Sequence, residues 1–319
     1  MAGPRNLKNR ARVHRDVKDV HAMAPPAGRL TLRRVGVSGV RKPLAVQRPD
    51  RVVTLSVDFA VHVDLPSSRK GSDLSRNAQL LTEVVDATAT RPVESLEGAC
   101  VQIARELLER HAYAQDAEVS ARAEYFLPRG VSPERRSLED YILLADARAA
   151  RNGSSPTPTV VWSVGAEAVG MTACPCAMES CRTLLEEEFP LLKDPSLAAL
   201  PIVSHNQRNR TRLVFEFLEP ARIEADSIVD AIESAQSSPT FAILKRGDEA
   251  RVVLNAHRNP KFVEDVLRDV LAGVPSRFPE LPAGTVVYAE TRSEESIHKY
   301  DVTASHRASL DELRRATGS

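Results

Sequence analysis

The chain is poor in cysteine, in net charge and in long hydrophobic runs, and each shortage excludes a class of protein. Lys plus Arg and Asp plus Glu number 43 each, so recognition of an anionic partner must rest on local charge, and neither nucleic acid nor a membrane is expected as a partner. No run of about 18 apolar residues occurs, and the N-terminus has no apolar signal-peptide region. We therefore expect a soluble cytoplasmic protein, whose four cysteines are thiols or ligands rather than disulfides.

The chain has enough apolar residues for a folded core. It is 42% hydrophobic and 27% charged, a composition typical of globular domains. Residues 1–28 are polar, basic and proline-containing, which predicts a disordered tail. We expect residues 29–319 to form a single domain.

Hydrophobic periodicity predicts a repeated unit within that domain. Residues 53–65 alternate as a half-buried strand, and apolar residues spaced by three and four predict two helices after it. The polar, arginine-rich interval 128–157 reads as a long excursion, after which strands and helices recur. The expected helices are 74–89, 93–111, 224–236 and 260–273, and the further strands are 119–127, 158–169, 211–218 and 284–291.

Two strands followed by two helices, repeated, predict an α+β fold rather than a doubly wound one. The modules would span about 29–127 and 158–305. We expect their antiparallel sheets to join edge to edge, with the helices on one face.

The stretch MTACPCAMES, residues 171–180, places Cys174 and Cys176 on either side of a proline. A redox pair usually has the spacing CxxC, and a bond within CPC would be strained. A structural zinc site needs four closed ligands; Cys181 could be a third, but no fourth lies at short range. The third possibility is a catalytic metal site, which needs a few well-separated ligands and one open position.

Three residues in the second half could complete such a site. His205 lies in SHNQRNR before a predicted strand, Glu249 lies in KRGDEAR, which reads as a turn, and His298 lies in SIHKYD after the last predicted strand. Each one alone would be an ordinary exposed residue. With Cys174 they form a thiolate, imidazole and carboxylate set that suits Zn(II) or Fe(II).

Several of these stretches, in this order, resemble the GTP cyclohydrolase IV family. That family contains the bacterial type IB enzyme and the archaeal enzyme that opens methanopterin synthesis. The resemblance covers roughly residues 30–318, and its motifs are RRVGVSGVRKPL, VDLPSSRKGSDLSRN, MTACPCAMES, SHNQR, KRGDE, NPKFVEDVLRD and SIHKYD.

The resemblance implies a tunnelling (T-) fold of two ββαα modules and a homotetramer with active sites between subunits. It implies that Cys174, His205, Glu249 and His298 bind the metal, which would be Fe(II), with Zn(II) or Mn(II) as alternatives. Cys174, His205 and His298 would be catalytic. Glu264, in NPKFVED, is similar to the glutamate that holds a purine or pterin ring, where two parallel hydrogen bonds would fix guanine and reject adenine.

The same resemblance implies that Lys70, Arg76 and Arg208 bind the triphosphate of GTP. Two positions depart from the family pattern. Asp73 stands where the family usually has a histidine, and a carboxylate there would repel phosphate unless it is turned away. Tyr300 stands where the family has a second histidine, and it could replace part of that residue's role in proton transfer.

The family contains two activities, and both begin by opening the guanine imidazole of GTP at C8 with release of formate. The bacterial type forms 7,8-dihydroneopterin triphosphate for folate, and the archaeal type forms 7,8-dihydroneopterin 2′,3′-cyclic phosphate. The long insert between Cys174 and His205, TLLEEEFPLLKDPSLAALPIV, resembles the archaeal type, which we expect here. A T-fold enzyme with a cysteine nucleophile and a non-catalytic purine or pterin binder remain as alternatives.

Overall fold

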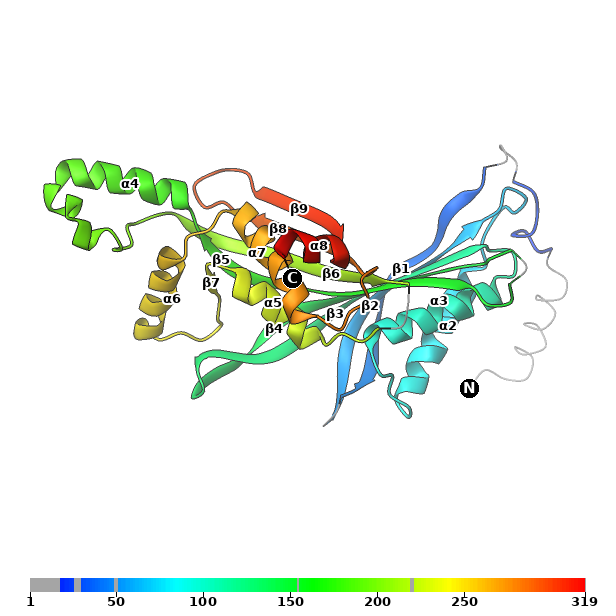
Figure 1. Ribbon diagram of the computed structural model, residues 1–319. Coiled ribbons are helices and arrows are strands. Elements are labelled where there is room, and N and C mark those ends of the chain that lie inside the picture. Colours follow the sequence, from blue (N-terminus) through cyan, green and yellow to red (C-terminus); the bar gives the residue numbers. More distant parts are fainter. Residues whose placement is uncertain (1–17, 26–29, 49–50, 154, 219–220, 319) are drawn as a thin grey trace.

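The computed structural model describes residues 18–25, 30–48, 51–153, 155–218 and 221–318, and these form one long antiparallel sheet with helices packed on it (Figure 1). The strand order is β1-β2-β3-β4-β5-β6-β8-β9, and the short β7 pairs with β5. Of the disordered tail expected over 1–28, all but residues 18–25 lies outside the described residues.

The first half of the chain forms four strands, with two helices between the second and third strands. Its elements are β1 (Leu32–Gln47), β2 (Val52–Leu65), α2 (Leu74–Thr88), α3 (Leu96–Arg110), β3 (Asp116–Ser132) and β4 (Arg135–Ala150). The strand expected at 53–65 and both helices are confirmed.

The second half repeats this plan and adds helices. Its elements are β5 (Thr159–Ala173), α4 (Pro175–Glu188), the 3-10 helices η1 (Pro190–Lys193) and η2 (Pro195–Leu197), β6 (Asn206–Phe217), α5 (Ala225–Ala235), β7 (Ser238–Pro239), α6 (Arg246–Arg258), α7 (Val263–Arg277), β8 (Val286–Ser293), β9 (Val302–Ser309) and α8 (Leu310–Thr317). In the described part of the chain, no helix is long and apolar enough to cross a membrane.

The long excursion expected over 128–157 is wrong. β3 continues to Ser132, and β4 returns from Arg135 along its whole length. β4 buries Tyr141 and Leu143 and then three alanines at alternate positions. Alanine is a weak strand signal, and arginine and aspartate occupy the intervening exposed positions, so the alternation was hidden. Each module is therefore ββααββ rather than ββαα.

Two smaller expectations also change. KRGDEAR is not a turn, because α6 begins at Arg246 within it. His298 does follow β8, but a further strand, β9, comes soon after, so His298 lies in the loop that joins the two. That loop lines a pocket that also contains Cys174.

The two sheets join edge to edge, as expected, through β4 and β5. Buried Ala145 of β4 lies opposite buried Val164 of β5, and residues directly opposite in an antiparallel pair share a face. α3 packs against β3, β4 and β5, while α5 packs against β5 and α7 against β8 and β9. All the helices that cover the core therefore lie on one face, which confirms the α+β architecture.

Cys100 belongs to this core. It is completely buried on α3, with its Sγ 3.9 Å from the carbonyl oxygen of Ala145. Burial raises the pKa of this thiol well above its usual range, so it stays protonated. Cys100 is therefore a structural residue of the core.

Candidate active site

A pocket of about 220 Å³ lies where β5 and β8 end and β6 begins. Its lining brings together four of the residues singled out in the sequence: Cys174, His205, Glu264 and His298. They arrive from four separate segments, namely the start of α4, the start of β6, the first turn of α7 and the β8–β9 loop. Gln207, Glu295 and Tyr300 also line the pocket.

Cys174 is placed by a strand that ends and a helix that begins. Pro175 occupies the first position of α4, which suits its fixed φ, and Cys174 is the N-cap. The backbone N–H of Ala177 donates to the Cys174 Sγ at 3.4 Å, and the helix N-terminus favours negative charge there. All four cysteines are unpaired thiols; Cys176 is exposed and Cys181 half-buried.

His205 is oriented by a network of buried side chains. Its Nδ1 lies 2.8 Å from the Oε1 of Gln207, while the Gln207 amide nitrogen donates to Thr172, Ser293 and Glu295 at 3.0, 3.2 and 3.4 Å. Because that nitrogen has three acceptors, Oε1 is the acceptor toward His205, and Nδ1 carries the proton. The Nε2 lone pair of His205 is then available to a metal or a proton.

Glu295 was missed by the sequence reasoning. Its side chain is only 10% exposed, and its Oε2 lies 3.6 Å from the His205 Nδ1. The signal was the acidic pair at 294–295 directly after a strand and before SIH. The structure separates the two residues, because Glu294 pairs outward with Arg210 at 2.7 Å.

Glu264 lies in the first turn of α7, where its exposed carboxylate borders the pocket. The two cations near it in sequence are engaged elsewhere: Lys261 pairs with Asp269 at 2.6 Å and Arg268 with Asp265 at 3.1 Å. Among the residues that the structure describes, Glu264 forms no ion pair. Its carboxylate is therefore free to accept hydrogen bonds from a ligand.

His298 and Tyr300 stack in the β8–β9 loop. Their ring centroids lie 4.9 Å apart with only 8° between the planes, and Tyr300 is 62% exposed. Both rings line the pocket. Tyr300 therefore presents a phenol beside the imidazole, at the position where the family pattern has a second histidine.

Four residues singled out in the sequence do not line this pocket. Glu249 is exposed on α6. Lys70 precedes α2 and Arg76 lies in its first turn, both in the first module. Arg208 is exposed on β6, and it points away from the pocket because adjacent strand residues face opposite sides and Gln207 faces in.

The carboxylate of Asp73 is surrounded by basic side chains. It lies 3.5 Å from Arg69, 3.3 Å from Arg76 and 3.8 Å from the Nδ1 of His21. Among the described residues, Asp19, His21 and Asp73 are the only group of three potential ligands whose atoms all lie within 4.8 Å of one another. The side chains around Cys174 are thus spread more widely than a closed metal cage.

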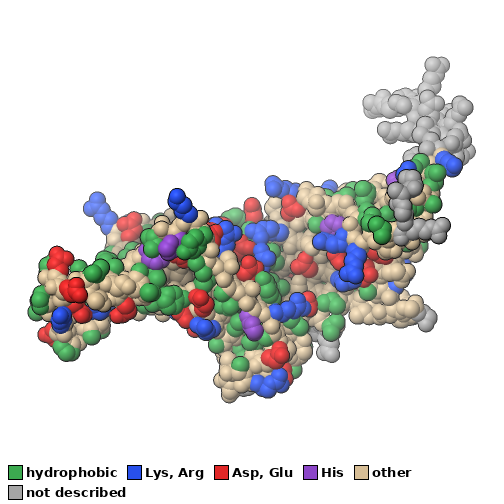
Figure 2. Space-filling view, turned by 90° about the horizontal axis from the view of Figure 1, so that it is seen from above, with side chains coloured by type: hydrophobic (Ala, Val, Ile, Leu, Met, Phe, Trp, Pro, Cys, Tyr) green, Lys and Arg blue, Asp and Glu red, His purple; other side chains and the backbone are tan. Residues whose placement is uncertain are grey.

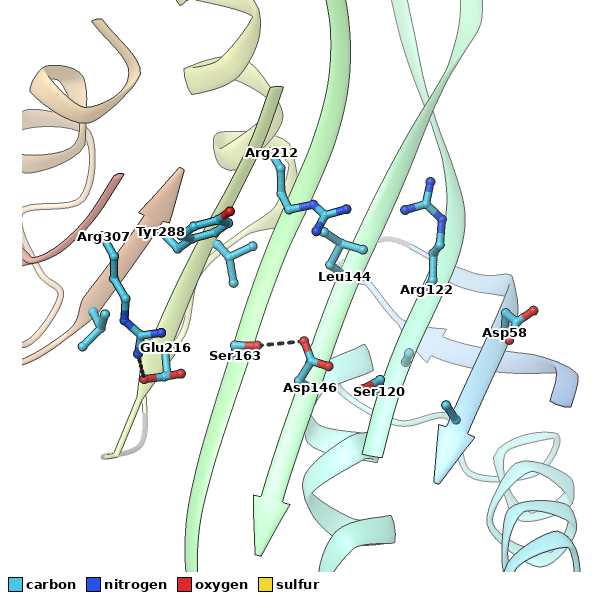
Figure 3. A pocket seen from close by; sticks show the side chains of 14 residues that line it. Asp58, Ser120, Arg122, Leu144, Asp146, Ser163, Arg212, Glu216, Tyr288 and Arg307 are labelled. Carbon is cyan, nitrogen blue, oxygen red and sulfur yellow. Dashed lines mark hydrogen bonds and ion pairs between the residues drawn. The ribbon is translucent and has the colours of Figure 1, made fainter. Parts of the chain in front are cut away.

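A larger groove of about 590 Å³ crosses the face of the sheet opposite the described helices that cover the core. Figure 3 shows Arg122, Arg212 and Arg307 on three strands that are not adjacent, β3, β6 and β9, with the carboxylates of Asp58, Asp146 and Glu216 on the same face. Arg307 pairs with Glu216 at 2.6 Å, and Arg122 and Arg212 share Glu167 at 3.5 and 3.4 Å. Cysteine and histidine are missing from its lining residues, so the thiol and imidazole chemistry lies in the smaller pocket.

Comparison with known proteins agrees with the motifs. A family model described as type I GTP cyclohydrolase folE2 matches residues 17–304. Two proteins named GTP cyclohydrolase MptA are each 38% identical to this chain. The one from Methanoregula boonei aligns over 93% of this chain and 92% of its own length, and the one from Methanospirillum hungatei over 94% and 93%.

Among solved structures, a uricase from Bacillus fastidious aligns over 92% of this chain and 98% of its own, with 12% identity and a TM-score of 0.48. The family match, together with the two-module antiparallel sheet, confirms the tunnelling fold. Because the family model covers most of the chain and the relatives align over nearly their whole length, the chain belongs to the GTP cyclohydrolase family, whose members are enzymes that act on GTP.

Proposed function

We propose that this protein is a metal-dependent GTP cyclohydrolase that opens the guanine imidazole of GTP at C8, releases formate and forms 7,8-dihydroneopterin 2′,3′-cyclic phosphate for tetrahydromethanopterin-type pterin synthesis. The observation that carries the proposal is the pocket that joins Cys174, His205 and His298 with the free carboxylate of Glu264. We place the reaction in the cytoplasm.

The pocket's donors fit a borderline divalent metal, for which we propose Fe(II), with Zn(II) or Mn(II) as alternatives. Cys174, His205 and His298 offer a thiol and two imidazoles, and the Gln207 contact leaves the His205 Nε2 free. When bound, the metal would activate water for attack at C8. The resemblance also names Glu249 as a ligand, and since Glu249 lies outside this pocket, its carboxylate would have to come from a neighbouring subunit.

The other pocket side chains would bind and orient the base. The Glu264 carboxylate would accept hydrogen bonds from guanine N1–H and the exocyclic amine, a donor pair that adenine lacks. Phe262, 43% exposed at the pocket rim, offers an apolar surface beside it. The Tyr300 hydroxyl, adjacent to His298, is placed to hold or pass a proton during ring opening.

The triphosphate would be bound across a subunit boundary. Lys70 and Arg76 belong to the first module, far along the sheet from the pocket, and Arg208 faces away from it. A homotetramer in which the first module of one subunit lies beside the pocket of another would bring these cations to the substrate. This is the arrangement that the family resemblance implies.

The choice of product rests on the insert that contains α4, η1 and η2, and on the relatives named MptA. The triphosphate product of the type IB enzyme is the alternative, which the folE2 description of the matching family model favours. The two products differ in phosphate number, so mass distinguishes them.

The deciding experiment is a GTP assay on purified protein that has been stripped with a chelator and reloaded with Fe(II) or Mn(II). We expect formate and a cyclic monophosphate product by mass spectrometry, and no turnover without metal. A product that keeps three phosphates would establish the type IB reaction instead. Turnover that survives chelation but is abolished by thiol alkylation would indicate a cysteine nucleophile, and binding without turnover would indicate a non-catalytic binder.

A further inference from the structure

The insert between Cys174 and His205 forms an arm, residues 175–203, that projects from one end of the molecule (Figure 1). Helices on globular proteins usually bury an apolar stripe, but Met178 is the only residue that α4 buries. Five large apolar side chains of the arm are exposed, each by 48% to 75%. They are Leu184, Phe189, Leu191, Leu200 and Val203.

The arm is also acidic. It contains five acidic and two basic side chains, with three glutamates in a row at 186–188. Figure 2 shows acidic side chains interspersed with hydrophobic ones at this projecting end. Glu187 and Glu188 are exposed, and the ion pairs of the described residues include neither of them. The arm therefore presents an apolar surface with negative charge, and none of the residues that the structure describes covers it.

Helix α6 also presents exposed apolar side chains, but the charged residues around them are basic. Ile243, just before it, and Val253 and Leu254 within it are 55%, 45% and 42% exposed. Lys245, Arg246, Arg251 and Arg258 are exposed as well. The acidic Asp248 is turned inward, 1% exposed, where it pairs with Arg135, so Glu249 is the one exposed carboxylate of α6.

We propose that the arm of one copy packs on α6 of a second copy of this chain. Both surfaces lie at the same end of the molecule (Figure 1), and within one chain α4 packs against η1, whereas α6 packs against β5 and β7. A two-fold axis at this end would join each arm to the other copy's α6, as closed dimers require. Opposite charges around an apolar centre give such a contact its specificity.

The contact would act on the active site through the two ends of the arm. Cys174 and His205, which bound the arm, both line the pocket, and the C-terminal part of α6 touches the base of the arm where the His257 Nε2 lies 3.3 Å from the carbonyl oxygen of Ser204. Docking of the arm would therefore add to the β5–β6 pairing that positions both site residues. The proposal specifies one interface of the proposed tetramer and does not depend on which reaction the enzyme catalyses.

Exposed-residue variants test it by molar mass, measured with light scattering at low and high salt. Leu191→Glu puts a charge in the apolar centre; Glu187→Lys/Glu188→Lys and Lys245→Glu/Arg246→Glu each put like charges in contact. Acidic residues at the start of α6 favour the helix, so the last pair should not unfold it. Leu138→Glu, at a 67% exposed position on β4, is the matched control, and circular dichroism checks folding.

We expect the wild type to be oligomeric, with a contact that weakens at high salt. Leu191→Glu and each charge pair should shift the protein to a smaller species, Leu138→Glu should not, and the chain that carries all four charge reversals should regain the wild-type mass. A monomeric wild type, or unchanged mass in the variants, would overturn the proposal. If the charge pairs lower the molar mass and the four-charge variant does not regain it, the arm does not bind α6. Because this experiment measures molar mass and not turnover, its outcome is independent of the outcome of the GTP assay.

Discussion

The backbone N–H of Cys174 donates a hydrogen bond to the carbonyl oxygen of His205 at 3.1 Å, although the whole arm lies between them in the sequence. The bond continues the ladder of β5 and β6, whose preceding pair is Ala173 with Asn206. Ser204 reinforces it, because its hydroxyl donates to the Cys174 carbonyl at 2.6 Å. The thiol and the imidazole are thus positioned by strand pairing, and the length of the insert does not alter their separation.

Replacing Glu295 should weaken metal binding. Its carboxylate lies beside the His205 Nδ1 and accepts from Gln207, and loss of such an outer partner typically costs about 10–100-fold in affinity. We expect Glu295→Gln to reduce Mn(II) affinity, measured by calorimetry on stripped protein, by that factor. Glu294→Gln, one position earlier but paired outward with Arg210, should leave the affinity unchanged. Equal Mn(II) affinities in the two variants would show that Glu295 has no role in metal binding.

Glu264→Gln should weaken GTP binding. An amide keeps one acceptor but loses the charge that strengthens both hydrogen bonds to guanine, and charge-assisted hydrogen bonds contribute about 1.5–3 kcal/mol each. We expect the Kd for GTP on stripped protein to rise about 10–100-fold. Arg268→Ala on the same helix, a residue that pairs only with Asp265 among the described residues, serves as the control. An unchanged Kd in Glu264→Gln would contradict the base-binding role.

Strong periodicity explains what the sequence predicted correctly. In β2, Val57, Phe59, Val61 and Val63 occupy alternate positions and are all almost fully buried. The CPC, HNQ and SIH motifs predicted three residues of the pocket, because a thiol and imidazoles among polar residues are chemically distinctive.

The rest of the site depends on contacts that one sequence does not encode locally. α6 was missed because its buried residues, Asp248, Val252 and Ala256, include a charged one, while Val253 and Leu254 are exposed among arginines, so no apolar stripe marks the helix. Glu295 and Glu294 are adjacent and chemically identical, and only the twist of the chain after β8 turns one of them into the pocket. Lys70 and Arg76 were assigned by motif, and their distance from the pocket follows from the length of the sheet.

Asp73→Asn should strengthen binding of GTP if Arg76 contacts phosphate as proposed. The carboxylate lies 3.5 and 3.3 Å from Arg69 and Arg76 and competes with phosphate for both. Removing its charge should lower the Kd for GTP severalfold at low salt, with a smaller gain at high salt. Asp86→Asn, exposed on the same helix, is the control. Weaker binding in Asp73→Asn would mean instead that the carboxylate holds Arg76 in its binding position.

His111 should make the stability of the fold depend on pH. It is fully buried, with its Nε2 2.6 Å from the Asn77 Oδ1 and its Nδ1 3.0 Å from the Tyr113 hydroxyl. Burial lowers the pKa of His111, and the positive charge of Arg76 lowers it further. The native imidazole therefore stays neutral at pH values where the unfolded chain, with a histidine pKa of about 6.5, takes up a proton.

Since the unfolded state binds more protons in that window, the free energy of unfolding should fall as pH decreases below about 6.5, and the decrease should end at the lowered native pKa. We expect His111→Gln to be less stable than wild type at pH 8, because buried hydrogen bonds are perturbed, and the gap to narrow toward pH 5. Urea unfolding across this range measures it, with exposed His306→Gln as the control. A gap that stays constant or widens in acid would show that His111 is protonated in the native state.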